Sequence, residues 1–283
     1  MKKTYLITGS NSGIGYSATL EMARKEPDSI FLLPSRTMAK AQDNCHKLRQ
    51  LTGNMNMIPY ECDLSNFEDI YSLSEKIKEN YSALDVLVNN AGVFKLKKTI
   101  TPNHLEETYQ VNYFAPFLLT QLLLDLLDKS ENPRIVNVSS VLHFRAKSLD
   151  FKELIQTDSF QNMDHYCKSK LALILFNNQL AYILRDQTKY SINSLHPGGV
   201  STRIARDSWF FNLIAKIIGI SPEKGAKPII YLAQDPESKN FTGKYFDKEN
   251  KKPVPSSPLS YICNLNAELY SSTLKYFNLS PKI

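Results

Sequence analysis

A glycine-rich turn between a buried strand and a helix constrains the fold of this chain more than any other feature. Tyr5-Leu6-Ile7 predicts the strand, and residues 16–25 predict the helix. Glycine allows positive φ and a close approach of the backbone to a ligand, and a helix N-terminus offers free N–H groups and a dipole that favours anions. The turn therefore predicts a phosphate cradle made of Gly9, Ser10, Asn11, Ser12, Gly13, Ile14 and Gly15.

Strands and helices continue to alternate along the 283-residue chain. The pattern predicts further strands over residues 30–33, 56–61, 84–88, 134–139, 190–195 and 243–246. It predicts further helices over residues 38–51, 67–81, 105–128 (kinked at Pro116), 166–186 and 226–233. Such alternation is typical of an α/β fold with a parallel sheet and helices on both faces. We expect one doubly wound, Rossmann-type domain over residues 1–283, with an exposed loop over 247–258 and a largely helical tail over 259–283.

Composition limits the classes of function. The net charge of +6 favours anionic ligands, but no long basic run indicates nucleic-acid binding. The four cysteines have neither disulfide-framework nor zinc-site spacing, so no metal is expected. No signal peptide or membrane span is evident, which predicts a cytoplasmic protein. The apolar stretch 209–220 leaves peripheral contact with a membrane open.

The end of the second strand bears on the choice of cofactor. An acidic residue at this position would bind the ribose hydroxyls of NAD and repel a 2′-phosphate. This chain instead has Ser35-Arg36, and a guanidinium pairs well with a phosphate. The sequence therefore predicts NADP(H) rather than NAD.

Three motifs together resemble the short-chain dehydrogenase/reductase family over residues 4–246. They are the Gly-x-x-x-Gly-x-Gly spacing of the turn, Asn89-Asn90-Ala91-Gly92 at the end of the fourth strand, and Tyr166 four residues before Lys170. The long stretch from Ser140 to Tyr166 is most similar to retinol-dehydrogenase-like members. The resemblance implies that Asp63 and Leu64 meet the adenine, and that Asn90, Ala91 and Gly92 line the adenosine ribose region.

Tyr166 and Lys170 lie on one face of the predicted helix. Reduction of a carbonyl needs a proton donor, and a phenol with an ordinary pKa of about 10 becomes usable when an ammonium lies near it. The resemblance implies that Tyr166 is the acid/base, that Lys170 also holds the nicotinamide ribose, and that Ser140, with Ser139 as a structural neighbour, polarises the carbonyl. It implies that Asn112 supports a water chain to Lys170.

The segment after the sixth strand completes the expected site. Pro197, Gly198, Val200 and Thr202 are expected to hold the nicotinamide or pyrophosphate, and His196 is expected to be structural. Residues 142–164 are expected at the substrate mouth, and the apolar residues 203–225 as a lid over a lipophilic substrate such as a retinoid, steroid or aldehyde.

The sequence leaves several alternatives open. The segment 203–225 also fits a lid packed on its own core or a subunit contact, and a homo-oligomer remains open. The main alternative function is a catalytically silent dinucleotide-binding protein with a regulatory or interaction role. The favoured hypothesis is an NADP(H)-dependent enzyme acting on a small-molecule carbonyl or alcohol, because Ser140, Tyr166, Lys170 and Asn112 are all present.

Overall fold

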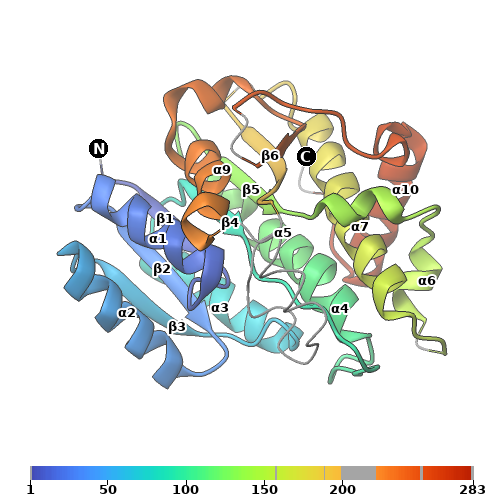
Figure 1. Ribbon diagram of the computed structural model, residues 1–283, viewed down its shortest axis with the longest axis horizontal. Helices are drawn as coiled ribbons and strands as arrows, with labels where there is room; N and C mark the ends of the chain where they lie inside the picture. Colours follow the sequence, from blue (N-terminus) through green and yellow to red (C-terminus); the bar gives the residue numbers. More distant parts are fainter. Residues whose placement is uncertain (1, 157, 188, 199–220, 249–250, 282–283) are drawn as a thin grey trace.

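The computed structural model describes residues 2–156, 158–187, 189–198, 221–248 and 251–281. Its centre is a parallel seven-stranded sheet with the order β3-β2-β1-β4-β5-β6-β7 (Figure 1). The strands are β1 (Thr4–Ile7), β2 (Ile30–Ser35), β3 (Met57–Glu61), β4 (Val86–Asn89), β5 (Arg134–Val138), β6 (Ser191–His196) and β7 (Lys244–Asp247). The predicted α/β fold is confirmed.

Helices lie on both faces of the sheet (Figure 1). The longer ones are α1 (Gly13–Lys25), α2 (Met38–Thr52), α3 (Phe67–Asn80), α5 (Ala115–Leu127), α7 (Asn162–Ile183), α9 (Pro222–Gln234) and α10 (Cys263–Tyr276). Shorter turns are α4 (Glu107–Tyr109), the π-helical η1 (Gln110–Phe114), α6 (Phe151–Ile155) and the 3₁₀ segments η2 (Val141–Arg145), η4 (Pro236–Asn240) and η5 (Pro258–Tyr261).

Side chains of successive strand residues enter two different cores, because they point to opposite faces of the sheet. Tyr5 and Ile7 of β1 pack in the core formed with α1, α2 and α9. Leu6, between them, packs in the larger core formed with α3, α5, α7 and α10. Every residue of β1 is buried, as expected for a parallel strand covered on both faces.

Two boundaries differ from the sequence-based expectation for reasons that involve proline. Strand β2 continues through Pro34 to Ser35, because β1 pairs with β2 only as far as Leu32, so the missing N–H of Pro34 leaves no bond of that ladder unmade. The helix expected to kink at Pro116 instead contains the π-helical turn η1, in which the N–H of Ala115 bonds to the carbonyl of Gln110. The wider turn lies directly before the proline and absorbs the irregularity.

The segment after β7 is less exposed than predicted. Lys251 and Lys252 are exposed, but Ser256 and Ser257 are buried, at 5% and 2% exposure. Val254 forms an antiparallel bridge with Tyr245 of β7. The expectation of an exposed loop is therefore wrong for this pair of serines, because their polar groups have partners within the protein. No helix in the described ranges is long and apolar enough to span a membrane.

Candidate active site

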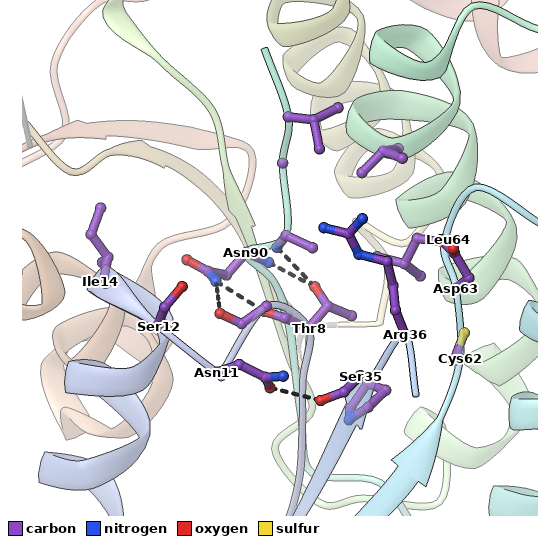
Figure 2. A pocket seen from close by; sticks show the side chains of 18 of the residues that line it. Thr8, Asn11, Ser12, Ile14, Ser35, Arg36, Cys62, Asp63, Leu64 and Asn90 are labelled. Atoms are coloured by element: carbon purple, nitrogen blue, oxygen red, sulfur yellow. Dashed lines mark hydrogen bonds between the residues drawn. The ribbon is translucent and has the colours of Figure 1, made fainter. Parts of the chain in front are cut away.

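A cavity of about 390 Å³ lies at the carboxyl ends of β1, β2 and β4, beside the N-terminus of α1 (Figure 2). The chain runs from β1 outward to β3 in one direction and from β4 to β7 in the other, so the cavity is at the point where the strand order reverses. Ligands of open α/β sheets bind at this place. Of the residues expected to bind a cofactor, its wall includes Gly9, Asn11, Ser12, Gly13, Ile14, Gly15, Arg36, Asp63, Leu64, Asn90, Ala91 and Gly92.

The glycine-rich turn is packed too closely for larger residues. A Cβ on Gly15 would lie 2.3 Å from the carbonyl oxygen of Gly9, and Gly9 itself has φ +69°. The amide of Asn90 donates to the carbonyls of Thr8 (2.9 Å) and Gly9 (3.1 Å), as Figure 2 shows. Ser12, the N-cap of α1, makes no side-chain capping bond, so its hydroxyl does not cap the first N–H groups of the helix. A tight turn at a helix N-terminus fits the pyrophosphate of a dinucleotide.

Two polar side chains of the turn face other parts of the protein. Ser10 is fully buried, and its Oγ accepts a hydrogen bond from Asn44 of α2 (3.2 Å), so its side chain points away from the cavity. Asn11 lines the cavity while its Oδ1 accepts from Ser35 Oγ (2.7 Å) at the end of β2 (Figure 2). This bond joins the turn to the strand that carries Arg36.

Arg36 and Asp63 occupy the wall on the β2–β3 side. Arg36 is exposed and follows the last residue of β2, where an acidic residue would favour NAD. The Asp63 carboxylate accepts from the backbone N–H (2.9 Å) and hydroxyl (2.8 Å) of Ser65. It holds this turn, while the N-cap of α3 is Asn66.

Several wall residues were not predicted from the sequence. Thr8 Oγ1 accepts from the N–H groups of Asn90 and Ala91, both at 3.0 Å. Lys95 and Glu107 form an ion pair of 2.6 Å at the wall of the cavity, although they lie 12 positions apart and carry no motif. The only hint in the sequence is that a lysine and a glutamate both follow the fourth strand within a short stretch.

Tyr166, on α7, lies next to the end of β5. Ser140, directly after Ser139 at the end of that strand, hydrogen-bonds to the Tyr166 side chain. Burial raises the pKa of Tyr166 to about 12, and the Ser140 bond acts in the opposite direction. Phe94, from the cavity wall, packs edge-on against the Tyr166 ring with 5.4 Å between centroids. Ser139 differs from Ser140, because its Oγ donates to the Lys170 carbonyl (2.8 Å).

Lys170 lies one turn further along α7 and is 4% exposed. Its Nζ donates to the carbonyl of Val138 (3.0 Å) and lies 5.9 Å from the centroid of the Tyr166 ring. Burial lowers the pKa of Lys170 to about 8. The Ser140 hydrogen bond acts to lower the pKa of Tyr166, and the pKa of Lys170, the group that the sequence indicated for this role, is itself lowered by burial.

Asn112 joins the Tyr166–Lys170 helix to the cavity wall. It lies in the π-helical turn η1, and its amide accepts from the N–H of Val93 (2.8 Å) and donates to the Val93 carbonyl (2.9 Å) and to Ser169 Oγ (3.0 Å). A Cβ on Gly92 would lie 3.1 Å from Lys170 Nζ and 3.2 Å from Asn112 Oδ1. The cavity and the candidate catalytic groups therefore meet at Gly92 and its neighbours.

The expected nicotinamide segment is only partly described. Pro197 and Gly198 follow β6, and Val200, Thr202 and residues 203–220 of the lid expected over 203–225 lie outside the described residues, while its last residues enter α9. His196 is 7% exposed, and burial, with Lys248 nearby, lowers its pKa to about 4. It is therefore neutral near pH 7. The expected substrate mouth over 142–164 contains the short segments η2 and α6.

Comparison with known proteins gives the family. The family described as short chain dehydrogenase matches residues 3–210. The chain belongs to this family. Retinol dehydrogenase 13 of Homo sapiens is 36% identical over 266 residues, covering 90% of this chain and 79% of that protein. Polyprenol dehydrogenase of Homo sapiens is 32% identical over 278 residues, covering 95% and 83%.

A solved structure adds a cofactor to this comparison. A short chain dehydrogenase from Shigella flexneri, crystallised with NADP, has a TM-score of 0.68 at 25% identity, covering 87% of this short-chain dehydrogenase and 96% of that chain. Family membership identifies the present chain as an oxidoreductase. The alternative of a catalytically silent binding protein is therefore set aside, and the cavity fits a nicotinamide dinucleotide.

Proposed function

We propose that this short-chain dehydrogenase interconverts a lipophilic carbonyl compound and its alcohol with NADP(H), with Tyr166 as the acid/base. The observation that carries the proposal is the convergence of Tyr166, Ser140 and Lys170 beside Gly92, where the dinucleotide cavity ends. When bound, the reduced cofactor supplies a hydride to the carbonyl carbon.

The chain's own residues then handle the carbonyl oxygen. Tyr166 donates its phenolic proton to that oxygen as charge develops there. Ser140 Oγ already accepts from the N–H of Leu142 (3.2 Å), so its hydroxyl proton is available for the substrate oxygen or for Tyr166. Lys170, held by Val138, can pass a proton towards Tyr166, because its pKa of about 8 is close to neutral pH. Asn112 keeps the loop at Val93 in place.

NADP(H) is the proposed cofactor because Arg36 lies at the wall beyond β2. The complex of the Shigella flexneri relative with NADP supports this choice. Pro197 and Gly198, together with Val200 and Thr202, are the proposed contacts of the nicotinamide end. The names of the retinol and polyprenol dehydrogenases, and the apolar Phe94 beside Tyr166, support a lipophilic substrate.

The decisive experiment replaces Tyr166 with phenylalanine. Tyr166→Phe should lower turnover of NADPH with retinal or a polyprenal by about 10³-fold or more, because the proton donor is lost while the ring remains. NADPH affinity, measured by fluorescence titration, should stay within about twofold, since the phosphate cradle is untouched. Tyr182→Phe is the matched control, because Tyr182 is on the same helix but 60% exposed. Normal turnover by Tyr166→Phe would refute the mechanism.

Arg36 provides a separate test of cofactor choice. Arg36→Ala should raise the KM for NADPH about 10-fold or more and leave that for NADH nearly unchanged, because one charge-assisted phosphate contact is lost. Steady-state kinetics with both cofactors measures this. Arg24→Ala, at an exposed ion pair on α1, should change neither value. Equal loss with both cofactors would contradict recognition of the 2′-phosphate by Arg36.

A further inference from the structure

A fully buried histidine follows Ser140 at the end of β5. His143 lies on η2 and has 0% exposure. Its Nδ1 is 2.6 Å from the Ser140 carbonyl oxygen, and its Nε2 accepts from the backbone N–H of Ser257 (3.0 Å). The side chain therefore bridges the Ser140 loop and a segment 114 residues further along the chain.

The two partners fix the proton of this imidazole. A backbone N–H can only donate, so His143 Nε2 is unprotonated, and a carbonyl can only accept, so Nδ1 carries the hydrogen. Burial lowers the pKa of His143, which keeps the ring neutral near pH 7. Tyr245 packs edge-on against it with 4.9 Å between centroids, so the ring has little freedom to turn.

The bridge acts on the backbone that orients the Ser140 hydroxyl. The Ser140 carbonyl accepts from both Nδ1 and the backbone N–H of His143 (3.1 Å), and Ser140 Oγ accepts from the N–H of Leu142. With these bonds in place, the Ser140 hydroxyl hydrogen-bonds to Tyr166. The carbonyl carbon and the side chain of Ser140 are both attached to its Cα, so a displaced carbonyl would shift Cα and move Oγ relative to Tyr166.

Ser257 is itself held by a local network of hydroxyl groups. Ser256 Oγ and Ser260 Oγ are 2.6 Å apart, and Ser260 Oγ donates to the Ser257 carbonyl (2.6 Å). The Ser260 carbonyl accepts from Asn178 of α7 (2.9 Å) and from Asn266 of α10 (3.0 Å). The segment 256–260 is thereby fixed to α7, the helix that carries Tyr166.

We propose that His143 is a positioning residue, which transmits the placement of segment 256–260 to Ser140 through the bonds from Ser257 N–H to Nε2 and from Nδ1–H to the Ser140 carbonyl. The inference rests on the proposed roles of Ser140 and Tyr166. Since segment 256–260 is fixed to α7 and Tyr166 is part of α7, the relay determines the position of the Ser140 hydroxyl relative to the Tyr166 phenol.

A matched pair at Ser257 tests the relay without touching the imidazole. Ser257→Pro removes the backbone donor together with the hydroxyl, at a φ of −52° that proline adopts, whereas Ser257→Ala removes the hydroxyl alone. Ser257→Pro should lower kcat about 10- to 100-fold, the scale of a misplacement of about 1 Å. It should leave NADPH affinity within about twofold, because the cradle is remote from the relay. Ser257→Ala should behave like the wild type.

The pH profile separates positioning from a general loss of structure. Alcohol oxidation requires Tyr166 as phenolate, so its rate rises with pH through the pKa of Tyr166, which Ser140 lowers. Ser257→Pro should therefore move this rise to higher pH, and the shift should resemble that of Ser140→Ala. A purely structural defect would reduce the amount of folded enzyme and leave the profile in place.

His143 variants divide the relay into its two halves. Asn Nδ2 can replace only imidazole Nδ1 and the Gln side-chain amide only Nε2, so each variant keeps one of the two bonds, and His143→Asn and His143→Gln should both lower kcat as Ser257→Pro does. If Ser140→Ala impairs turnover but Ser257→Pro and His143→Gln keep the wild-type kcat and pH profile, the relay is refuted and the proposed function stands. If Ser140→Ala itself is fully active, the proposed function fails and the relay fails with it.

Discussion

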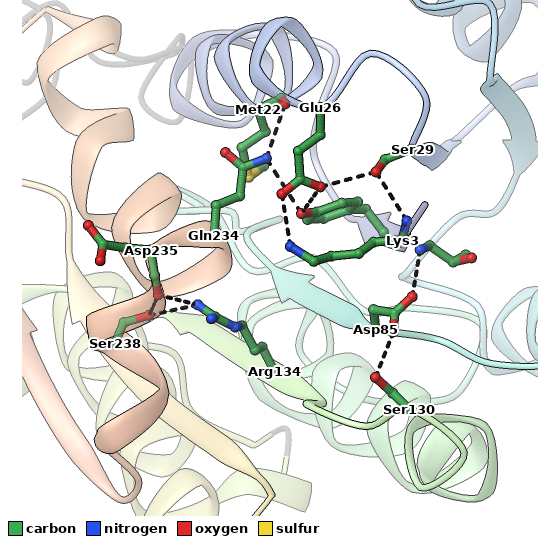
Figure 3. Close-up of polar contacts among 12 residues, drawn as sticks. Lys3, Met22, Glu26, Ser29, Asp85, Ser130, Arg134, Gln234, Asp235 and Ser238 are labelled. Atoms are coloured by element: carbon green, nitrogen blue, oxygen red, sulfur yellow. Dashed lines mark hydrogen bonds and ion pairs between the residues drawn. The ribbon is translucent and has the colours of Figure 1, made fainter. Parts of the chain in front are cut away.

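Charged groups at the two ends of the sheet differ in how many hydrogen-bond partners they have. At the amino ends of the strands, Glu26 accepts from Lys3 Nζ (2.9 Å), Tyr5 OH (2.6 Å) and Ser29 Oγ (3.0 Å) (Figure 3). Arg134 Nη1, at the start of β5, reaches the carbonyls of Leu232 and Asp235 and the hydroxyl of Ser238, at 2.7–3.0 Å. Each of these charged groups has three hydrogen-bond partners.

At the carboxyl ends, the buried groups have few partners. Within the described part of the chain, Lys170 Nζ has one hydrogen bond, to Val138, and no carboxylate pairs with it. The Nδ1 of His196 has no hydrogen-bond partner there. The pKa of Lys170 falls to about 8 and that of Tyr166 rises to about 12, whereas the pKa of Glu26 lies below its ordinary value. Charged groups with three partners stabilise the fold at one end, and groups with one partner or none leave the other end able to exchange protons.

Among the predicted variants, Lys170→Met should show the difference between the two ends of the sheet most strongly. It should lower kcat about 10²- to 10³-fold, because the proton relay beside Tyr166 is lost. It should also raise the free energy of unfolding by about 1 kcal/mol at pH 7, since a buried ammonium with one partner is removed. Turnover and urea denaturation measure these effects.

The lowered pKa of Lys170 also predicts how the free energy of unfolding changes with pH. Because the folded pKa of Lys170 is below its unfolded value, the unfolded chain binds more protons between pH 8 and about 10.5, so wild-type stability gains from this residue as pH rises. The advantage of Lys170→Met should therefore shrink over that range. A loss of stability in Lys170→Met at pH 7 would contradict the view that this end is under-partnered.

Arg134→Met should have the converse effect at the other end. It removes a 7%-exposed guanidinium and leaves three acceptors without their donor, which should lower the free energy of unfolding by about 3 kcal/mol. The kcat per folded molecule should not change. Arg24→Met, at an exposed ion pair, should fall within about 0.5 kcal/mol of the wild type. A large fall in kcat of folded Arg134→Met would show that the ends are coupled.

Glu26→Gln should have the smallest effect. Burial alone would raise the pKa of Glu26, but bonds from Lys3 and Tyr5 outweigh it and lower the pKa. The carboxylate therefore stabilises the fold above the unfolded pKa, and this contribution disappears as pH falls through the folded pKa. The variant should lose about 1 kcal/mol at pH 7, and the difference from wild type should close in acid, as the pH falls through the lowered folded pKa of Glu26. An unchanged difference at low pH would exclude the carboxylate as its cause.

The fold was largely predictable because its signals are local. Period-two and helical patterns, with turns such as Thr8–Gly15, located every strand of the sheet to within a few residues. The errors lie where tertiary contacts decide. Pro34 is allowed in β2 because β1 ends beside it, and Ser257 is buried because a distant histidine accepts its N–H.

The candidate site was predictable in part for the same reason. Spacing placed Tyr166 and Lys170 on one face of α7, and the glycine turn placed the cavity. Spacing cannot report burial, which raises the pKa of Tyr166 and lowers that of Lys170. Nor does the ion pair of Lys95 with Glu107 have a local signature.

The amide of Asn90 has a consequence for how the chain reaches its folded state. It ties together the backbone carbonyls of Thr8, directly after β1, and Gly9, in the glycine turn, from 82 and 81 positions away. The phosphate cradle is therefore not a property of the first βα unit alone, and it can form only after β4 docks beside β1. Because such a non-local contact must be closed against loop entropy, competence to bind a dinucleotide should appear late in refolding, after most helices have formed.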